Sequence, residues 1–486
     1  MIPLKDASLL KQQAFINNHW TESDTGETIP VNNPSDGNRL GIVPSLSAVE
    51  IGSAVDAAQR AFNDWRRKTA KERAALLRQW YRLIIENQED LAAMMTAEQG
   101  KPLVEARGEV IYAAGFIEWY AEEGKRVYGD TIPTHQAGSR IVVLKEPVGV
   151  CAAITPWNFP AAMITRKAGP ALASGCTIVV KPASQTPFTA LALAELALRA
   201  GLPAGVFNVV TGAAAVVGKA LLGNPAVRKI SFTGSTEVGK QLMRQSADSV
   251  KKISLELGGH APFIVFDDAD VDAAVEGAVA SKYRNSGQTC VCTNRMLVQS
   301  GVHKEFARKL VDKVKALKVA DGFEPDSQQG PLIDMAAVEK VELHIKDAVS
   351  LGAQLLTGGR RHARGGTYFE PTVLIGVTAD MLIAREETFG PVAPIIPFED
   401  EAEALRLAND TIYGLAAYFY SRDIGRIWRV SEGLEYGIVG INTGIISTVE
   451  VPFGGMKQSG IGREGGKYGI EDYLEIKYLC MAGIDS

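Results

Sequence analysis

Hydrophobic and polar residues alternate in three different ways along the first half of the chain. Over residues 48–125 the apolar positions recur three and four apart, as at Ala74 and Leu77, which predicts helices. From about 127 to 150 the pattern becomes that of an extended hairpin, with a Gly-Ser pair before the alternating run 140–145. Short apolar runs then alternate with helical stretches, which predicts βαβ units around a parallel sheet. These runs lie at 150–155, 176–180, 206–210, 229–233 and 252–257.

The helix that follows residue 186 has clear start and stop signals. Thr186 occupies the N-cap position and Pro187 the first helical position. Apolar repeats continue to Leu198, and Gly201 and Pro203 then end the pattern. The sequence therefore predicts a helix between the second and third strands of the sheet.

A second α/β series covers residues 262 to 442 and predicts a second lobe. Its strand candidates are 263–266, 296–298 and 415–420, and its helical stretches are 302–317 and 335–350. The tail, residues 470–486, alternates again. We expect this tail to pair with the extended segment or with another chain.

The composition excludes disordered, collagen-like and coiled-coil proteins. Of 486 residues, 46% are hydrophobic and 22% are charged, and the length predicts about three domains. The net charge of −5 includes no basic stripe, which argues against nucleic-acid binding. Five cysteines cannot form a disulfide scaffold and favour a reducing cytoplasm. The N-terminus lacks the apolar core of a signal peptide, and glycine and proline interrupt the uncharged run 201–218, so no membrane segment is expected.

Glycine makes up 48 of the 486 residues, about 10%, whereas its usual share is ~7%. Two glycine-rich segments resemble nucleotide-binding motifs. Gly460–Gly465 matches G-x-G-x-x-G, but too few residues follow it for a βαβ unit, so a tight loop is expected. Gly234–Gln241 is nearly a phosphate loop, yet Gln241 stands where a magnesium-binding hydroxyl is required. Because Gly234 ends a strand and Ser235 opens a helix, this segment favours a dinucleotide pyrophosphate, with a plain strand–helix turn as the alternative.

Two side chains are candidates for a nucleophile and a base. Cys290 follows a glycine-containing turn, which predicts an exposed loop tip, unlike Cys151, Cys176 and Cys480. A cysteine thiolate is a strong nucleophile near neutral pH, although an isolated cysteine is more often an inert apolar residue. Glu256 ends the last strand of the first series, where open α/β sheets bind ligands. Partial burial there raises a carboxyl pKa toward that of a general base; a surface carboxylate is the alternative.

Other chemistry finds less support in the sequence. The six histidines show no metal-ligand spacing, so no protein metal site is expected. No G-x-S-x-G motif indicates a serine hydrolase. Cys290 and Cys292 form a Cys-x-Cys pair that is either redox-active or metal-binding in other settings, but further ligands are lacking nearby.

Together these segments resemble the NAD(P)-dependent aldehyde dehydrogenase superfamily over essentially the whole chain. Seven blocks follow the family's order, and Glu256 and Cys290 have the family's separation. Four segments resemble its succinate-semialdehyde branch in particular. His260 departs from the residue that relatives often carry after the Gly pair, at a position without a catalytic role in the family. The seven blocks are Thr155–Pro160, Lys181–Ser184, Phe232–Ser235, Glu256–Gly259, Gly287–Cys290, Glu386–Pro391 and Pro452–Gly455; the branch segments are Met163–Gly169, Phe263–Asp270, Cys290–Cys292 and Tyr468–Glu475.

The resemblance implies an α/β fold with two open parallel-sheet, Rossmann-like lobes and a small β oligomerisation arm. It implies a cofactor-binding domain at 1–126 and 150–258 and a catalytic domain at 259–458. The oligomerisation element is then 127–149 with 459–486. It further implies a cytoplasmic homo-oligomer, a dimer of dimers, with no nucleic-acid, membrane or metal partner.

The resemblance also implies the mechanism. Cys290 attacks the aldehyde to give a thiohemiacetal, and the Asn158 amide and the Cys290 backbone N–H hold its oxyanion. Hydride transfer to the nicotinamide leaves a thioester, which a water activated by Glu256 hydrolyses. Lys181 and Glu387 are similar to residues that hold the two riboses. The implied cofactor-binding residues are Pro156, Trp157, Asn158, Lys181, Ala183, Ser184, Gly212, Phe232, Thr233, Gly234, Ser235, Val238, Leu257, Glu387 and Phe389.

NADP is the expected cofactor, with NAD also accepted. In NAD-specific relatives an acidic residue often lies three positions after the equivalent of Lys181, and here that residue is Ser184. Ser184 removes a charge that would repel the 2′-phosphate, while Lys181 remains to attract it.

The implied substrate is succinate semialdehyde, an intermediate of 4-aminobutyrate degradation. Arg166, Arg284 and Ser447 match positions that bind the distal carboxylate in this branch, as a carboxylate needs a cationic partner. Three alternatives remain: glutarate semialdehyde as substrate, a cofactor-independent Cys acyl hydrolase or transferase, and a non-catalytic NAD(P)-binding protein. A regulatory disulfide between Cys290 and Cys292 is a further hypothesis, which requires a mobile loop.

Overall fold

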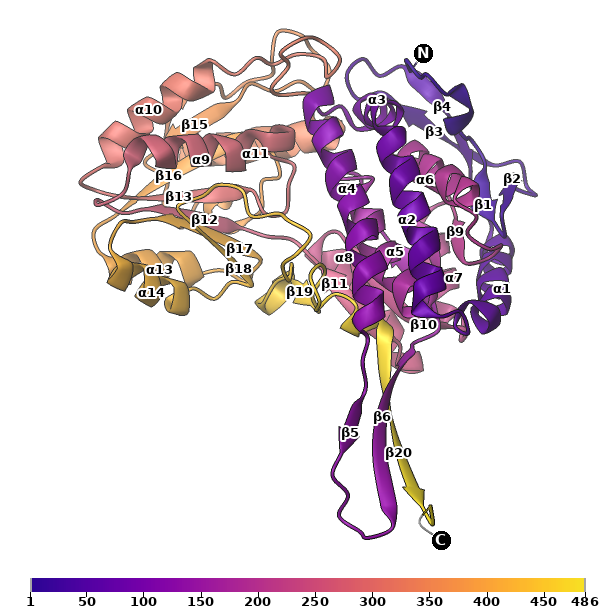
Figure 1. The fold of residues 1–486 in the computed structure, drawn as a ribbon. Helices are drawn as coiled ribbons and strands as arrows, with labels where there is room; N and C mark the ends of the chain where they lie inside the picture. Colours follow the sequence, from indigo (N-terminus) through magenta and orange to yellow (C-terminus); the bar gives the residue numbers. More distant parts are fainter. Residues whose placement is uncertain (1, 485–486) are drawn as a thin grey trace.

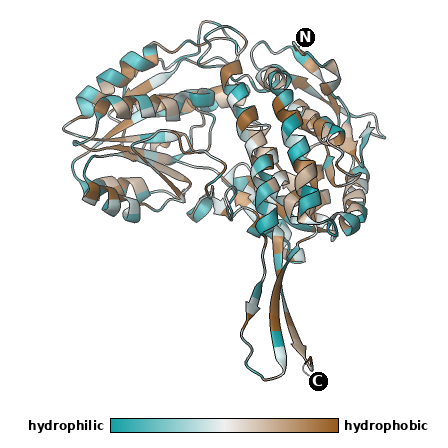
Figure 2. Ribbon diagram, viewed as in Figure 1, coloured by the Kyte–Doolittle hydropathy of each residue, from teal (hydrophilic) through white to brown (hydrophobic). Residues whose placement is uncertain are grey.

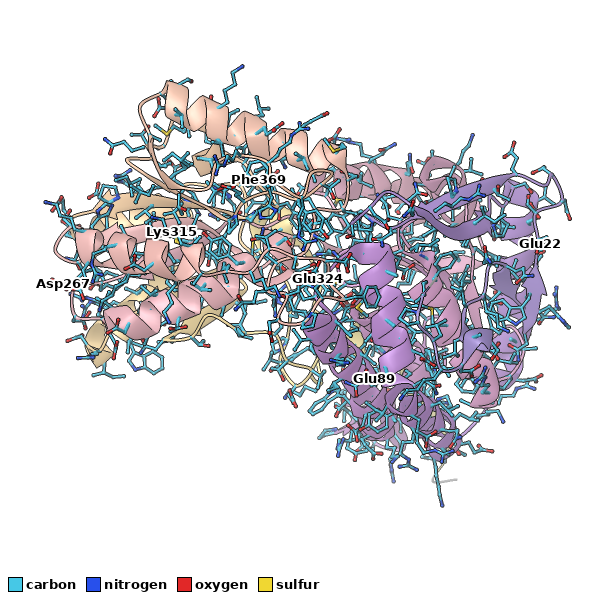
Figure 3. The ribbon with its side chains drawn as sticks, turned by 90° about the horizontal axis from the view of Figure 1, so that it is seen from above. Glu22, Glu89, Asp267, Lys315, Glu324 and Phe369 are labelled. Carbon is cyan, nitrogen blue, oxygen red and sulfur yellow. The ribbon has the colours of Figure 1, made fainter. Side chains whose placement is uncertain are left out.

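The computed structural model describes residues 2–484, whose two large lobes lie side by side with a narrow arm extending away from them (Figure 1). Seen from above, Asp267 and Lys315 mark the outer end of one lobe and Glu22 that of the other (Figure 3). The predicted α/β class, with two parallel-sheet lobes and a β arm, is confirmed.

The first lobe contains an eight-stranded sheet with a parallel centre. Its order is β19-β11-β10-β7-β8-β9-β1-β2, and β1, β2 and β19 are antiparallel to their neighbours. The five apolar runs predicted from the sequence form β7 to β11. The strands are β1 (Ala14–Ile16), β2 (His19–Thr21), β7 (Val150–Ile154), β8 (Thr177–Lys181), β9 (Phe207–Val209), β10 (Val227–Thr233), β11 (Lys252–Glu256) and β19 (Gly460–Ile461).

Two layers of helices accompany this sheet. Helices α1, α5, α6, α7 and α8 pack on its strands, while α2, α3 and α4 pack on α5 and α6. The predicted helical stretch 48–125 is confirmed as α1 to α4. The helices are α1 (Ala48–Trp65), α2 (Ala70–Glu86), α3 (Gln88–Gln99), α4 (Leu103–Glu123), α5 (Ala162–Ser174), α6 (Pro187–Arg199), α7 (Ala214–Gly223) and α8 (Thr236–Ser246).

The start of α6 corrects one expectation about its cap. Thr186 occupies the N-cap position, but its side chain makes no capping hydrogen bond. The Glu98 carboxylate, from α3, instead accepts from the backbone N–H of Phe188 at 2.8 Å and of Thr189 at 2.9 Å. A carboxylate satisfies the free N–H groups and the positive end of the helix better than a hydroxyl does. The capping residue lies about 90 positions away in sequence, beyond the reach of a local pattern.

The second lobe contains a seven-stranded sheet of order β14-β15-β16-β13-β12-β17-β18, parallel except for β14. Its core packs as two hydrophobic clusters. The strands are β12 (Ala261–Val265), β13 (Thr293–Gln299), β14 (Gln354–Thr357), β15 (Thr372–Ile375), β16 (Val392–Phe398), β17 (Ala416–Tyr420) and β18 (Ile438–Ile441), and the helices are α9 (Val271–Tyr283), α10 (His303–Lys315), α11 (Met335–Ser350), α12 (Leu382–Arg385), α13 (Glu401–Asn409) and α14 (Ile424–Gly433).

The arm is a three-stranded antiparallel sheet that joins distant parts of the chain. β6 (Ser139–Pro147) lies between β5 (Asp130–Ile132) and β20 (Leu474–Ala482), so the tail pairs with the extended segment as predicted. Figure 2 shows hydrophobic residues along β6. Ile476 and Tyr478 on β20 are 72% and 57% exposed.

Direct contacts between the two lobes fix how they face each other. The Gln99 side-chain amide donates to Asn285 Oδ1 at 2.9 Å, and the Thr367 hydroxyl donates to the carbonyl of Pro34 at 2.7 Å. No helix within residues 2–484 is both long and apolar enough to cross a membrane. The remaining elements are a hairpin of β3 (Thr28–Asn32) and β4 (Arg39–Pro44) and the 3-10 helices η1 (Ala7–Leu9), η2 (Gly124–Arg126), η3 (Ala247–Ser249), η4 (Arg284–Gly287), η5 (Lys457–Ser459) and η6 (Glu471–Tyr473).

Candidate active site

Cys290 lies on a sharply turned segment between α9 and β13. Asn285, Ser286 and Gly287 all adopt positive φ values, 51°, 57° and 75°. Only glycine fits at 287, because a β-carbon there would collide with the carbonyl of Gly390. The turn places Cys290 half-buried between two cavities rather than at the exposed loop tip that we expected. Burial raises the pKa of its thiol to about 12.

The other cysteines only partly match the expected contrast. Cys151 and Cys176 are buried as expected, but Cys480 is exposed on the arm strand β20. The expectation for Cys480 was wrong. The alternation of apolar and polar residues in the tail predicts a strand with two different faces, but it does not show which face packs against the protein. Cys292 is buried, and its thiol contacts the carbonyl oxygen of Gly287 at 3.2 Å.

The first cavity, of about 380 Å³, opens where β7, β10 and β11 end and faces the second lobe. Ser235 caps α8 there by accepting from the N–H of Val238 at 3.3 Å. Across the cavity, the rings of Trp157 and Phe389 meet edge to face, with centroids 5.6 Å apart. Of the predicted cofactor-binding residues, those that line this cavity are Pro156, Trp157, Asn158, Thr233, Gly234, Ser235, Leu257, Glu387 and Phe389.

Six predicted cofactor residues lie outside that lining. Ser184 lines an adjoining cavity, which shares Ile333 and Asp334 with the first. Lys181 is buried at the end of β8, and burial lowers its pKa to about 8. The others are Ala183, Gly212, Phe232 and Val238, of which Val238 is exposed and the rest are buried.

Sequence analysis missed the wall of this cavity that α11 supplies. Asp334 caps α11, and the first turns of that helix form a wall of the cavity. The sequence predicted the helix, but its orientation toward the first lobe depends on how the lobes pack. The missed lining residues are Gly258, Ile333, Asp334, Ala336, Ala337, Lys340 and Thr388.

Glu387 lies half-buried beside the end of β11. Its Oε1 accepts from the backbone N–H of Gly259 at 3.1 Å, and burial raises its pKa to about 7. A β-carbon at Gly258 would lie 3.0 Å from the Glu387 carboxylate. The Gly258-Gly259 pair therefore lets this carboxylate approach the strand end closely.

The second cavity, of about 310 Å³, lies on the other side of Cys290 and brings together all three predicted substrate residues. The cavity is lined by Arg166 on α5, Arg284 on η4 and Ser447 in the loop after β18. The Arg284 guanidinium lies 5.6 Å from the Phe159 ring. Lining residues that sequence analysis missed are Lys101, Glu105, Gly108, Glu109, Tyr112, Phe159, Met163, Thr289, Val291 and Phe453.

Asn158 lines the first cavity, where several hydrogen bonds hold it. Its Nδ2 donates to the carbonyl of Gln288 at 3.0 Å, which leaves a second hydrogen of the amide available. The backbone carbonyl of Asn158 accepts from Lys101 Nζ at 2.7 Å and from Asn285 Nδ2 at 3.0 Å. These contacts orient the amide beside Cys290.

Glu256 is 3% exposed at the end of β11, and its Oε2 has no hydrogen-bond partner among residues 2–484. Burial raises the pKa of Glu256 above its usual value, and the neighbouring Glu464 charge raises it further. Glu464 is itself paired with Lys167 and lies 3.5 Å from the Arg166 guanidinium. An unpaired buried carboxyl with a raised pKa suits proton abstraction near neutral pH.

The glycine motif near the C-terminus contributes to this environment. Gly460 and Ile461 form β19, which pairs with Glu256 and Leu255 of β11. The segment is not a dinucleotide motif, as predicted, but it forms an edge strand and a β-bridge at Glu464 rather than the tight loop that we expected. Because it also supplies Glu464, it is more informative for the site than the sequence alone indicated.

No three His, Cys, Asp or Glu side chains within residues 2–484 lie close enough together to hold a metal ion. His260, next to the base, is buried with its Nε2 3.0 Å from the carbonyl oxygen of Ala384. Cys290 borders both cavities, Asn158 lines the first, and the charge of Glu256 acts on the Cys290 thiol. The described residues hold no metal cluster at this place.

Comparison with known proteins agrees with this arrangement. The model of the aldehyde dehydrogenase family matches residues 20–479. A succinate-semialdehyde dehydrogenase [NADP(+)] of Escherichia coli is 64% identical over 98% of this chain and 99% of its own length. A glutarate-semialdehyde dehydrogenase of Pseudomonas aeruginosa is 63% identical over 99% of this chain and 100% of its own. The crystal structure of an E. coli NADP-dependent enzyme, 64% identical, matches with a TM-score of 0.98 over 99% of this chain and 100% of its own. The chain belongs to the aldehyde dehydrogenase family.

Proposed function

We propose that the chain oxidises succinate semialdehyde to succinate with NADP+, and that NAD+ serves less well. The observation that carries this proposal is the position of Cys290, which borders both cavities. One cavity has the strand ends and helix N-terminus that suit a dinucleotide, and the other has two arginines that suit an anionic substrate.

The residues of the first cavity fit a nicotinamide dinucleotide. The Thr233 hydroxyl is buried there without a hydrogen-bond partner, and the N-terminus of α8 begins at Ser235. Lys181 and Glu387 would hold the two riboses, and Ser235 would meet the pyrophosphate. When bound, the cofactor accepts the hydride that leaves the substrate carbon.

The proposed preference for NADP depends on Ser184 and Lys181. Ser184 is uncharged and partly exposed in the cavity that adjoins the cofactor cavity. The E. coli relative of this chain, which is 64% identical, is described as an NADP(+) enzyme. A neutral residue beside a lysine favours the 2′-phosphate, whereas a carboxylate at 184 would repel it.

Cys290 is proposed as the nucleophile and Asn158 as the oxyanion donor. The Cys290 thiol passes its proton to water as its sulfur attacks the aldehyde carbon, and the new C–S bond forms the oxyanion of a thiohemiacetal. The free hydrogen of the Asn158 amide and the Cys290 backbone N–H then hold the oxyanion; a donor of this kind typically contributes ~3 kcal/mol. Loss of hydride from the same carbon gives a thioester on Cys290.

Glu256 is proposed as the base that completes the reaction. Its raised pKa allows it to take a proton from water near neutral pH, and the resulting hydroxide attacks the thioester carbon. The C–S bond then breaks, Cys290 regains its proton and succinate leaves. Arg284 and Ser447 bind the distal carboxylate throughout, and Arg166 supplies positive charge beside them.

We also propose the domain division and assembly that the sequence predicted. The first lobe, 1–126 with 150–258, would bind the cofactor, and 259–458 would form the catalytic domain. The arm, 127–149 with 459–486, would join copies into a dimer of dimers, supported by the exposed apolar residues of β20. A role in 4-aminobutyrate degradation in the cytoplasm follows from the proposed substrate.

The test is NADPH formation at 340 nm with succinate semialdehyde, glutarate semialdehyde and butanal in parallel, each repeated with NAD+. We expect the highest kcat/KM with succinate semialdehyde and NADP+. Equal or higher efficiency with NAD+ would overturn the cofactor assignment. Equal efficiency with butanal would overturn the assignment of an anionic substrate.

Glutarate semialdehyde is the second candidate substrate, because a relative described as acting on it is 63% identical. The two substrates differ by one methylene, which a pocket discriminates by only ~1–3 kcal/mol. A higher kcat/KM with glutarate semialdehyde in the same assay would favour this candidate.

A further inference from the structure

Tyr112 is a polar residue of the substrate-side cavity that neither the sequence motifs nor the proposed mechanism uses. It lies on α4 and shares the cavity lining with Cys290, Arg166 and Arg284. Its ring packs edge-on against that of Phe116, with centroids 4.9 Å apart, which fixes its direction. The hydroxyl is therefore a preorganised group in the cavity wall.

The hydrogen bonding of Tyr112 leaves its hydroxyl hydrogen free. Arg166 donates from Nη2 to the Tyr112 oxygen at 2.6 Å. A guanidinium has only donors, so the phenolic hydrogen cannot return to Arg166. Within residues 2–484, Tyr112 has no other side-chain hydrogen bond. Burial raises the pKa of Tyr112, so the phenol keeps this hydrogen at neutral pH.

Arg166 itself is already engaged with the protein. It is 2% exposed, its Nη1 lies 3.5 Å from Glu464, and its guanidinium lies 4.4 Å from the Phe453 ring. Glu464 therefore balances part of its charge before a substrate arrives, although Glu464 is shared with Lys167. Arg284 differs, since its guanidinium lines the cavity, lies 5.6 Å from the Phe159 ring and has no hydrogen-bonded partner among the described residues.

We propose that the Tyr112 hydroxyl donates a hydrogen bond to the distal carboxylate of the substrate, and that Arg166 acts on this carboxylate largely through Tyr112. The inference rests on the proposed function and identifies a specificity-determining residue for it. The bond from Arg166 draws electron density from the phenol oxygen and strengthens the O–H as a donor. Arg284 and Ser447 would supply the remaining donors, so three side chains would surround the carboxylate.

The test variant is Tyr112→Phe, which removes the hydroxyl and keeps the ring against Phe116. Its kinetics are compared with succinate semialdehyde and with butanal, which has the same chain length but no carboxylate. We expect KM for succinate semialdehyde to rise on the order of 10- to 100-fold, as for a lost hydrogen bond to a charged group. For butanal, kcat and KM should stay within about twofold, since Tyr112 is proposed to contact only the carboxylate.

Tyr81→Phe is the matched control, because Tyr81 lies on α2, outside the lining of both cavities. It should leave both substrates unaffected. A Tyr112→Phe enzyme that keeps the full preference for succinate semialdehyde, or loses efficiency equally with both aldehydes, would overturn this inference alone. A wild-type enzyme that shows no preference between the two aldehydes would overturn the proposed function and this inference with it.

Discussion

The buried ion pair between Lys101 and Glu109 supports the segment that carries Asn158, and its removal is expected to weaken both stability and catalysis. The Lys101 Nζ and Glu109 Oε2 are 2.6 Å apart, and each side chain is 1% exposed. Lys101 also donates to the carbonyl of Asn158 at 2.7 Å. Glu109 Oε1 accepts from the N–H of Ala161 at 2.9 Å and of Ala162 at 3.2 Å, at the start of α5.

The expected magnitudes follow from this burial. Lys101→Met keeps an apolar stem over the Phe159 ring but leaves Glu109 buried without its cation. Removal of one partner of a buried pair destabilises by about 3–5 kcal/mol, whereas removal of both charges is far less harmful. Glu109→Gln should be similarly destabilising, although its amide oxygen can still accept from α5. The double variant should therefore lose much less than the sum of the two single losses.

Catalysis should fall as well, because the Asn158 carbonyl loses one of its two donors. Asn285 still donates to it at 3.0 Å, so the segment shifts rather than unfolds. A displaced oxyanion donor predicts a decrease in kcat on the order of 10- to 100-fold in Lys101→Met, with a smaller change in KM. Denaturant unfolding and NADPH formation at 340 nm measure the two effects separately.

The control for this experiment is an exposed ion pair between α4 and α3. Arg107 and Glu89 are 2.8 Å apart with side chains 42% and 46% exposed, so Arg107→Met should change stability by only about 0–1 kcal/mol and leave kcat unchanged. Losses in the Lys101 and Glu109 variants that add within about 0.5 kcal/mol would refute the coupling between the two side chains. An unchanged kcat in Lys101→Met would refute the support of Asn158.

Three further outcomes are expected. Arg284→Ala should raise KM for succinate semialdehyde at least tenfold more than for butanal; an equal effect on both would count against its contact with the carboxylate. Glu464→Gln removes a charge that raises the pKa of Glu256. Because Glu256 acts when ionised, the acidic limb of the pH profile of kcat/KM should move to lower pH, and a move to higher pH would contradict this reasoning. Ser184→Glu should lower kcat/KM with NADP+ at least tenfold and leave the value with NAD+ nearly unchanged; comparable losses with both cofactors would argue for a structural effect.

The elements that sequence patterns predicted well are those with a local cause. The alternation of apolar runs located β7 to β11, and the cap at Ser235 was recognisable because strand end, cap and helix are adjacent. The tail was expected to pair with the arm because its alternation required a partner strand. In each case the spacing of the apolar side chains reflects which face of the helix or strand is buried.

The features that could not be predicted depend on contacts between distant segments. Glu98 replaces Thr186 as the cap of α6, and Glu464 reaches Lys167 from a loop about 300 residues away. Tyr112 and Lys101 are ordinary residues of a helical region until α4 packs against α5. Their roles become apparent only once this packing brings α4 to the wall of the substrate-side cavity.

The high glycine content indicates that backbone segments approach each other closely, but it does not show where in the fold they do so. A β-carbon at Gly259 would collide with the carbonyl of Cys290, and one at Gly454 would lie 2.9 Å from Glu256 Oε1. Glycine at these positions allows backbone segments from both lobes to meet at van der Waals distance around the nucleophile and the base. Close packing of this kind resists small displacements. The same contacts that assemble the site from two lobes therefore also limit how far Cys290 and Glu256 can move apart during the reaction.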